Sequence, residues 1–417
     1  MTALRRTLLL LAALALLAAG CGPARRRPPA VVGALYPLSG SQGTGGTEEE
    51  RGARLAVDWV NGHGGVKGQG VELVAADAPR PEAVPSALAA LRRRHVSVVL
   101  GSHGSVVSAE VAREATDQGL VFWETGAVGE TDAAVAGGSR FFRMAPMGAN
   151  LGRAAIAFVR DQVAPRLPVR RQLRYAVAYM DDVYGRAVGS GALVELRAGG
   201  QAVAGSFPYD AHAGDFAPLA TRIAASRPDV LFVAAYLDDG VAMRRSLVAA
   251  HVPLVTGIGT SSSYCMPAFG ETLGANAVGL FASDKPDAAA VRVDALSPEG
   301  RATLAWAQAR YRARYHQAMS APALSGFSNA YALLAHVLPA AGSTEPDAVA
   351  RAALGVKLPV GTLANGGGMD LAPPGDPQAG ENRSAASVIW EWVAPGQRAV
   401  VWPPAFATHP IAVLPLS

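Results

Sequence analysis

Short apolar runs alternate with amphipathic segments along most of this chain, and residues 95–130 show the pattern in a single unit. Residues 96–100 form a β-branched run that suits a buried strand, and Gly101 interrupts it. Residues 106–112 then carry apolar side chains at helical spacing, and a second short strand is expected at 120–123. This alternation predicts parallel β-α-β units and therefore an α/β fold.

The loops that follow these two strands contain candidate ligand-binding residues. Gly104 and Ser105 follow the first strand, and Glu124 and Gly126 follow the second. Both loops are expected at the carboxyl edge of one parallel sheet, where open α/β folds bind ligands. Backbone N–H groups at the predicted helix start near Ser105 would have no helical partner and would suit a carboxylate or phosphate. The same loop composition also fits an ordinary β-α-β unit without a ligand.

Residues 1–20 are predicted to be a secretory signal peptide. Two arginines precede an apolar run at 8–19, which is short for a membrane span and ends in small residues. Cys21 follows directly, as in the bacterial lipoprotein signal, in which the peptide is cut before the cysteine and the sulfur is lipidated. A plain signal peptide with a chance cysteine is the alternative. Residues 21–30 are rich in arginine and proline and are expected to form a basic tether at the membrane.

Composition argues against several function classes. Five of the 37 lysine and arginine residues lie in the leader and tether, which leaves 32 against 33 acidic residues in the folded part. Such a nearly neutral body lacks the concentrated basic face that a nucleic-acid partner would need. The eight histidines show no metal-ligand spacing. If Cys21 carries lipid, Cys265 has no disulfide partner and is expected to be a small buried residue or a free thiol.

The length of the folded part suggests two domains. A second series of strands and helices is predicted from about residue 149 to 282, and further helices are predicted from 297 to 354. Residues 361–381 are rich in glycine, proline and polar residues and are expected to form a long irregular connection. Two apolar and aromatic runs, 387–393 and 399–402, are expected to close the chain as a hairpin.

Five longer segments carry a family resemblance, and they occur in the family's order and spacing: VVGALYPLSG, RGARLAVDWVNGHGGVKG, FFRMAPMGANLG, AYMDDVYGRAVGSGALVELRAGG and GDFAPLATRIAASRPDVLFVAAYLDDGVAMRRSL. They resemble the type I periplasmic solute-binding proteins of the leucine/isoleucine/valine-binding group. The resemblance covers nearly the whole mature chain and weakens after Gly361. It implies two Rossmann-like α/β lobes that are joined by three hinge crossings, with a ligand held in the cleft between them.

The resemblance also implies domain boundaries and a function. The implied lobes are residues 31–146 with 282–356 and residues 147–281 with 357–417, and the implied crossings lie near Pro146, Phe281 and Val356. The implied function is that of a monomeric, lipid-anchored, extracytoplasmic binding protein of an ABC importer. It would close around an amino acid or a related ligand, such as an amide, a urea or an aromatic or apolar carboxylate, and deliver it to a permease and its ATPase. The resemblance implies no catalytic step, cofactor or metal.

Four ligand-binding positions of the family are matched in this sequence. Ser105 falls where a serine of the first lobe hydrogen-bonds the carboxylate of the amino acid, and Gly126 falls where backbone groups contact the ligand. Tyr184 and Tyr236 match aromatic residues of the second lobe that line the cleft. Packing at the ends of strands would also explain these two tyrosines.

Three other positions depart from the family. Val128 lacks the hydroxyl of a threonine that binds the carboxylate in many members. Ile258 or Gly259 occupies the place of the acidic residue that pairs with the α-ammonium group of the ligand. Gly45 replaces a common aromatic residue, in a loop before a helix that capping-box spacing predicts from Thr47 onward.

The missing acidic residue would have a large effect on affinity. Leaving a buried charge unpaired costs about 3–5 kcal/mol, against roughly 8 kcal/mol for an entire micromolar affinity. An ordinary amino acid would then bind at about millimolar concentration or worse. We hypothesise that Glu124, expected at the rim of the cleft, replaces the missing carboxylate; a solvated or arginine-paired Glu124 is the alternative. Trp123 would either stack on an aromatic or apolar ligand or belong to the core.

Two other function classes fit parts of the sequence. A sensory ligand-binding module that works with a separate membrane receptor would share the fold. An enzyme is less well supported, because the glycine-rich run at 43–46 lacks the lysine of a P-loop and the full dinucleotide spacing. His103 lies near Ser102 and Ser105, but no acidic residue that would orient it as a catalytic base is evident in the sequence.

Overall fold

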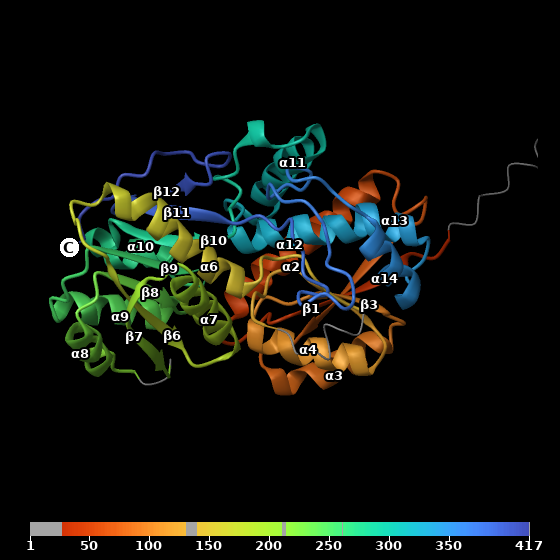
Figure 1. The fold of residues 1–417 in the computed structure, drawn as a ribbon. Helices are drawn as coiled ribbons and strands as arrows, with labels where there is room; N and C mark the ends of the chain where they lie inside the picture. The colour runs from red at the N-terminus through yellow and green to blue at the C-terminus, as the bar shows by residue number, and fades with distance from the viewer. Residues whose placement is uncertain (1–26, 131–139, 211–213, 261, 417) are drawn as a thin grey trace, which may run out of the picture.

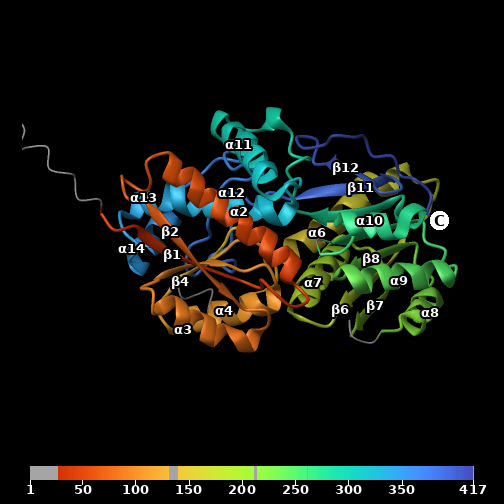
Figure 2. The ribbon, with the colours of Figure 1, turned by 180° about the vertical axis from the view of Figure 1, so that it is seen from behind.

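The computed structural model describes residues 27–130, 140–210, 214–260 and 262–416. These residues form two α/β lobes that lie side by side, each around its own β-sheet (Figures 1 and 2). The predicted α/β fold with two lobes is therefore confirmed. The signal peptide and lipidation site predicted at residues 1–21 lie outside the described residues. Within the described ranges, no helix combines the length and the apolar character that a membrane crossing needs.

The first lobe contains a five-stranded parallel sheet in the order β2-β1-β3-β4-β5. Its strands are β1 (Ala30–Tyr36), β2 (Val71–Asp77), β3 (Val98–Gly101), β4 (Val121–Glu124) and β5 (Phe141–Arg143). One face packs against α2 (Gly43–Gly62), α11 (Pro298–Tyr315), α12 (Ala321–Tyr331), α13 (Leu338–Ala341) and α14 (Pro346–Gly355), and the other against α3 (Val84–Arg92) and α4 (Ser105–Asp117). Because helices cover both faces, strands β1, β3, β4 and β5 are largely buried on both sides, whereas the edge strand β2 is partly exposed.

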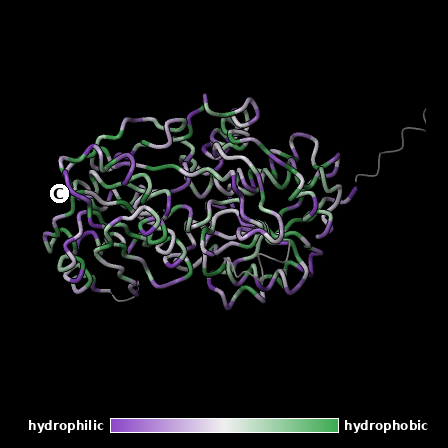
Figure 3. Tube along the Cα trace, in the orientation of Figure 1, coloured by the Kyte–Doolittle hydropathy of each residue, from purple (hydrophilic) through white to green (hydrophobic). Residues whose placement is uncertain are grey.

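The second lobe contains a seven-stranded sheet in the order β12-β11-β10-β9-β8-β6-β7. Its parallel strands are β6 (Arg174–Met180), β7 (Ala202–Tyr209), β8 (Val230–Ala234), β9 (Thr256–Thr260) and β10 (Leu280–Asp284). The predicted closing hairpin is present as antiparallel β11 (Val388–Ala394) and β12 (Gln397–Trp402). Helices α6 (Gly148–Phe158), α7 (Val183–Ala198), α8 (Ala217–Ser226), α9 (Leu237–Ala249) and α10 (Pro267–Leu273) complete the lobe. Figure 3 shows apolar and polar stretches alternating along the trace in both lobes.

Two elements begin at other residues than the sequence predicts, and both differences affect the pocket. Helix α2 begins at Gly43 and not at Thr47, whose hydroxyl instead donates to the backbone oxygen of Leu38 at 3.4 Å. Strand β9 (Thr256–Thr260) begins three residues later than the start of the strand that was expected at 253–257. Its sequence, TGIGT, has two glycines that weaken the local strand signal, and pairing with β8 and β10 on either side decides its position.

The chain passes between the lobes at three places. The first passage follows β5, near Pro146. Phe281 itself pairs within the second sheet, so the second passage comes after Asp284. In the irregular segment, apolar side chains of residues 358–371 still pack in the core of the first lobe. We therefore place the third passage between this segment and β11, and not near Val356.

Candidate functional site

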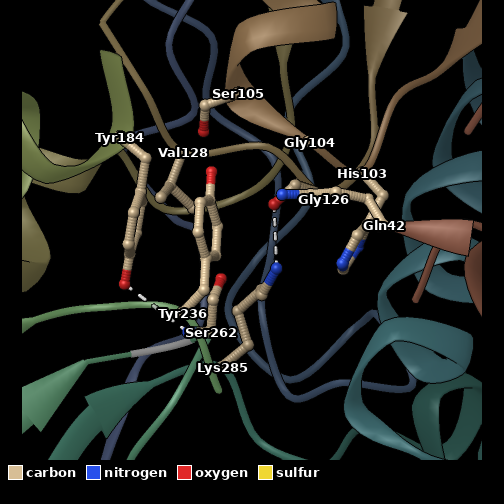
Figure 4. A pocket seen from close by; sticks show the side chains of 10 residues that line it. All are labelled: Gln42, His103, Gly104, Ser105, Gly126, Val128, Tyr184, Tyr236, Ser262 and Lys285. Carbon is tan, nitrogen blue, oxygen red and sulfur yellow. Dashed lines mark hydrogen bonds between the residues drawn. The ribbon is translucent and has the colours of Figure 1, made fainter. Parts of the chain in front are cut away.

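A small pocket lies where the two lobes face each other (Figure 4). Ten residues of the described chain line it: Gln42, His103, Gly104, Ser105, Gly126, Val128, Tyr184, Tyr236, Ser262 and Lys285. The first six come from the first lobe and the last four from the second lobe or the passage that leaves it. Helices α4 and α7 approach each other beside this gap (Figure 1).

On the side of the first lobe, the pocket is bounded by the loops after β3 and β4, at the carboxyl edge that the sequence predicts. Helix α4 begins at Ser105, and its first intrahelical bond runs from the N–H of Ser108 to the oxygen of Gly104 at 2.8 Å. The N–H groups of residues 105–107, in the first turn of α4, therefore have no partner within the helix. They lie at the end of the helix that borders the pocket. The Ser105 hydroxyl oxygen accepts from the N–H of Gly129 at 3.0 Å, so its hydrogen can be donated elsewhere.

On the side of the second lobe, two tyrosines form most of the wall. Tyr184 lies in the first turn of α7 and Tyr236 caps the start of α9, and their rings stack with centroids 5.2 Å apart. The hydroxyl of Tyr184 shares a hydrogen bond of 2.8 Å with Thr260, and that of Tyr236 donates to Asp182 at 3.3 Å. Burial, with the Asp182 charge, raises the pKa of Tyr236 well above its usual range. The structure thus brings both predicted aromatic residues into the pocket.

Lys285 is a pocket residue that the sequence analysis missed. It follows β10 directly, is only 9% exposed, and its Nζ donates to the backbone oxygen of Gly126 at 2.8 Å (Figure 4). This contact joins the passage after the second sheet to a loop of the first lobe. A signal was present in the composition, because only three of the 37 basic residues are lysines. A chain that uses arginine almost everywhere keeps a compact, flexible cation at this position.

A buried polar network stands behind the pocket. Glu49, on α2, is fully buried, and its Oε2 lies 2.9 Å from Nδ1 of His103. The Thr125 hydroxyl donates to Oε1 of Glu49 at 2.6 Å and shares a 2.8 Å hydrogen bond with Tyr36. A side chain at Gly126 would place its Cβ 2.0 Å from the Glu49 carboxylate, so any other residue there would have to displace that carboxylate. The sequence showed no acidic partner for His103 because Glu49 lies 54 positions earlier.

Glu124 does not lie at the rim of the cleft, contrary to our hypothesis. It is fully buried beneath the loop that follows β4. Its Oε1 accepts from the N–H groups of Gly126 and Ala127, both at 2.8 Å, and its Oε2 accepts from the N–H of Ser102 at 3.0 Å and from the Ser108 hydroxyl. Burial raises its pKa to about 7. The carboxylate holds two pocket loops together and is not available to a ligand.

Three further predicted residues do not line the pocket. Trp123 is fully buried in the first core, where its indole N–H donates to the oxygen of Asn329 at 2.8 Å. Ile258 is buried in the second core, and Gly259 packs under the ring of Tyr264. The error at 258 and 259 has the same cause as the shift of β9, because the strand ends three residues later than expected. Thus Ser262, beyond the strand end, is the described residue that reaches the pocket there.

Val128 and Gly45 differ in what they contribute. Val128 lines the pocket, as expected, and presents an apolar surface. Gly45 lies on α2, and a Cβ there would come within 2.2 Å of Nε2 of His103. The absence of a side chain at this position is what allows the imidazole to lie against the helix. Gln42 lines the pocket because α2 begins four residues earlier than predicted.

The polar residues do not form a catalytic arrangement. His103 is bonded to Glu49, whereas the Ser102 hydroxyl donates to the oxygen of Gly104 at 3.3 Å and Ser105 is bonded to Gly129. Among the described residues, no group of three or more histidine, cysteine or acidic side chains could hold a metal ion. Cys265 is a buried thiol that donates to Asp284 at 2.7 Å, which agrees with the simpler of the two expectations.

A family model and a curated relative both show that this chain is similar to binding proteins. The family model described as "Periplasmic binding protein" matches residues 29–377. "Leu/Ile/Val-binding protein homolog 8" from Brucella abortus (strain 2308) is 26% identical over 376 residues, which cover 89% of this chain and 90% of that protein.

Solved structures show the same fold at low sequence identity. A leucine binding protein from Thermotoga maritima MSB8 superposes with a TM-score of 0.73 at 17% identity, over 89% of this chain and 97% of that one. A solute binding protein from R. palustris in complex with benzoate has a TM-score of 0.69 at 17% identity, over 92% and 98% of the two chains. A branched-chain amino acid transporter binding protein from Streptococcus pneumoniae, in complex with isoleucine, has a TM-score of 0.71 at 18% identity, over 90% and 100%.

Proposed function

Because this chain belongs to the periplasmic binding protein family, and is a solute-binding protein of the branched-chain amino acid ABC transporter type, we propose that it captures a small carboxylate-bearing or polar solute and delivers it to a membrane permease. The family consists of transport binding proteins that act outside the cytoplasm, and not of enzymes. The identity of the solute, the permease and its ATPase, the monomeric state and the lipid anchor are parts of the proposal.

The observation that carries the proposal is a pocket whose walls come from both lobes. Ser105 and Gly126 belong to one wall, and Tyr184 and Tyr236 belong to the other. A solute can touch both walls only when the lobes meet, so its binding energy favours the closed arrangement. Three chain passages between the lobes restrict the motion to a hinge. The protein therefore signals the presence of its ligand by changing shape.

The ligand class that fits the first wall is a carboxylate. Ser105 offers a hydroxyl hydrogen and the start of α4 offers unpaired N–H groups, which together suit an anionic oxygen. Two relatives of known structure were solved with isoleucine and with benzoate, and both of these ligands carry a carboxylate. The stacked tyrosines and Val128 would face the apolar body of such a molecule.

A thermal-shift screen over amino acids, amides, ureas and aromatic acids tests solute capture. A ligand that binds only the folded protein stabilises it, by about 2.7 kcal/mol when the ligand is present at 100 times its Kd. The melting temperature rises as a result. Small-angle scattering with and without the best ligand should show a more compact protein when it is bound. If every solute class leaves both the melting temperature and the scattering unchanged, solute capture is wrong.

The membrane anchor is a separate part of the proposal. The apolar run at 8–19 and the cysteine that follows it would place a lipid on Cys21, with the tether arginines near anionic headgroups. Metabolic labelling with a fatty acid in a bacterial host should mark the full-length protein but not Cys21→Ser. Release of the wild-type protein into the soluble extracytoplasmic fraction, without label, would contradict the anchor.

A further inference from the structure

The charged groups of the pocket suggest a narrower ligand class. We propose that the ligand is an organic carboxylate that has an apolar or aromatic body and no ammonium group, and that Lys285 supplies its counter-charge. This inference rests on the proposed function, because it assumes that a solute occupies the pocket. It concerns the part of the pocket where an amino acid would place its ammonium group.

Lys285 is a buried cation without a carboxylate partner in the described part of the chain. Its Nζ donates to the uncharged backbone oxygen of Gly126, and among the described residues it forms no ion pair, although its charge acts on neighbouring Asp284. An ammonium group has three hydrogens, so two remain available to an acceptor in the pocket. A buried charge is costly until an opposite charge reaches it, and an anionic ligand would bring that charge.

The acidic residues near the pocket do not line it. Asp284, next to Lys285, accepts a hydrogen bond from the Cys265 thiol; burial raises its pKa, and the charge of Lys285 acts in the opposite direction. Glu49 is bonded through both oxygens to Thr125 and His103. No described residue that lines the pocket carries a carboxylate. An incoming ammonium group would therefore meet a cation on the pocket wall and no carboxylate on that wall.

Other groups of the pocket are suited to the same ligand. Hydroxyl and backbone N–H donors at Ser105 and the start of α4 lie on the same wall as Gly126, whose oxygen holds Lys285 (Figure 4). The rings of Tyr184 and Tyr236 and the side chain of Val128 offer apolar surface for the rest of the molecule. Donors, one cation and apolar walls match a monocarboxylate better than a zwitterion.

Calorimetry with matched ligand pairs tests this inference on the full-length protein. Each pair differs only in the ammonium group: 4-methylpentanoate against leucine, and 3-phenylpropanoate against phenylalanine, with 3-phenylpropanamide as the uncharged reference. We expect at least one acid to bind about 100-fold or more tightly than its amino acid, because the ammonium group would lie unpaired beside Lys285. The amide should bind more weakly than the acid.

Two variants show whether Lys285 is responsible. Lys285→Gln keeps a hydrogen-bond donor for Gly126 but removes the charge. It should lower the affinity for the acid by about 100-fold and leave the affinity for the amide within a few-fold of wild type. Lys67→Gln changes an exposed lysine in the first lobe and should leave both affinities unchanged. The melting temperature of ligand-free Lys285→Gln should not fall, since an unpaired buried charge has been removed, which separates lost binding from misfolding.

The outcomes distinguish this inference from the proposed function. Tighter binding of the amino acids than of their acids, or unchanged acid affinity in Lys285→Gln, would overturn the inference and leave solute capture intact. Binding of only neutral or cationic solutes in the wider screen would also overturn it. Failure of every solute class to bind or to compact the protein would instead remove the proposed function on which the inference rests.

Discussion

The first-lobe wall of the pocket consists mainly of loops that buried carboxylates hold in place, whereas the second-lobe wall consists of side chains at the ends of strands and helices. In the first wall, Glu124 bonds the loops after β3 and β4 to each other, and Glu49 lies behind Gly126. In the second wall, Tyr184 and Tyr236 reach into the gap themselves. We infer that changes in the carboxylates behind the first wall act chiefly through stability, and that changes in the tyrosines of the second wall act chiefly through affinity.

The largest effect on stability is expected from Glu124→Ala. The change leaves the buried N–H groups of Ser102 and Gly126 and the Ser108 hydroxyl without their acceptor, whereas the N–H of Ala127 still donates to the oxygen of Ser102, so the free energy of unfolding should fall by about 3–5 kcal/mol. Urea denaturation measures it. Glu110→Ala, on the surface side of the same α4, should cost less than about 1 kcal/mol. Equal losses in the two variants would mean that Glu124 does not hold the loops.

The pH dependence of stability gives the next largest effect. Burial raises the pKa of Glu124 in the folded protein to about 7, above 4.5 for the exposed group. The folded state therefore binds the Glu124 proton more tightly than the unfolded state does. The stability that this protonation contributes is complete below about pH 4.5 and is lost as the pH rises through 7. The loss corresponds to roughly 3 kcal/mol.

Glu124→Gln supplies the reference for that measurement, because it removes this titration and leaves the other groups in place. The difference in free energy of unfolding, wild type minus variant, should decrease between pH 5 and 8 in urea titrations. A difference that rises with pH would show instead that the four hydrogen bonds to Glu124 outweigh its burial and keep the carboxylate ionised.

A smaller effect, on affinity, is expected in the second wall. Tyr236→Ala removes the ring that stacks on Tyr184 and should weaken the tightest carboxylate of the matched series about 10-fold or more. Tyr236→Phe keeps the ring and loses the hydroxyl with its 3.3 Å bond to Asp182 and its contact with Gln42, so its affinity should stay within a few-fold of wild type. Calorimetry gives both values. If the alanine variant binds normally, the tyrosine pair serves packing alone.

The smallest effect is expected from Val128→Thr, which adds a hydroxyl to the first wall. Val128 is almost fully buried, so the polar atom should cost about 1 kcal/mol of stability or less if it reaches the pocket. A carboxylate that accepts from this hydroxyl should bind a few-fold tighter, which calorimetry can resolve. Weaker binding would place the ligand carboxylate away from residue 128 and would weaken the comparison of the two walls.

The sequence alone predicted the fold and the edge of the sheet where the pocket lies. Alternating apolar runs and helical stretches are local patterns, so β1 and β4, for example, were expected within one residue of their observed starts. Ser105, Gly126, Tyr184 and Tyr236 were expected near a ligand, and the structure places all four around one pocket. Prediction failed where local signals were weak, at the glycine-containing β9 and at the start of α2.

Only the tertiary structure decided which polar groups face the pocket. Glu124 follows a strand that the sequence located well, yet its carboxylate turns inward because N–H groups from two loops converge on it. Glu49 reaches His103 across 54 positions, and Lys285 reaches Gly126 across 159. Hydrophobic periodicity and secondary-structure propensity depend only on residues that are close together along the chain. The charge balance of a pocket depends on side chains that folding brings together from distant segments, and no local pattern specifies it.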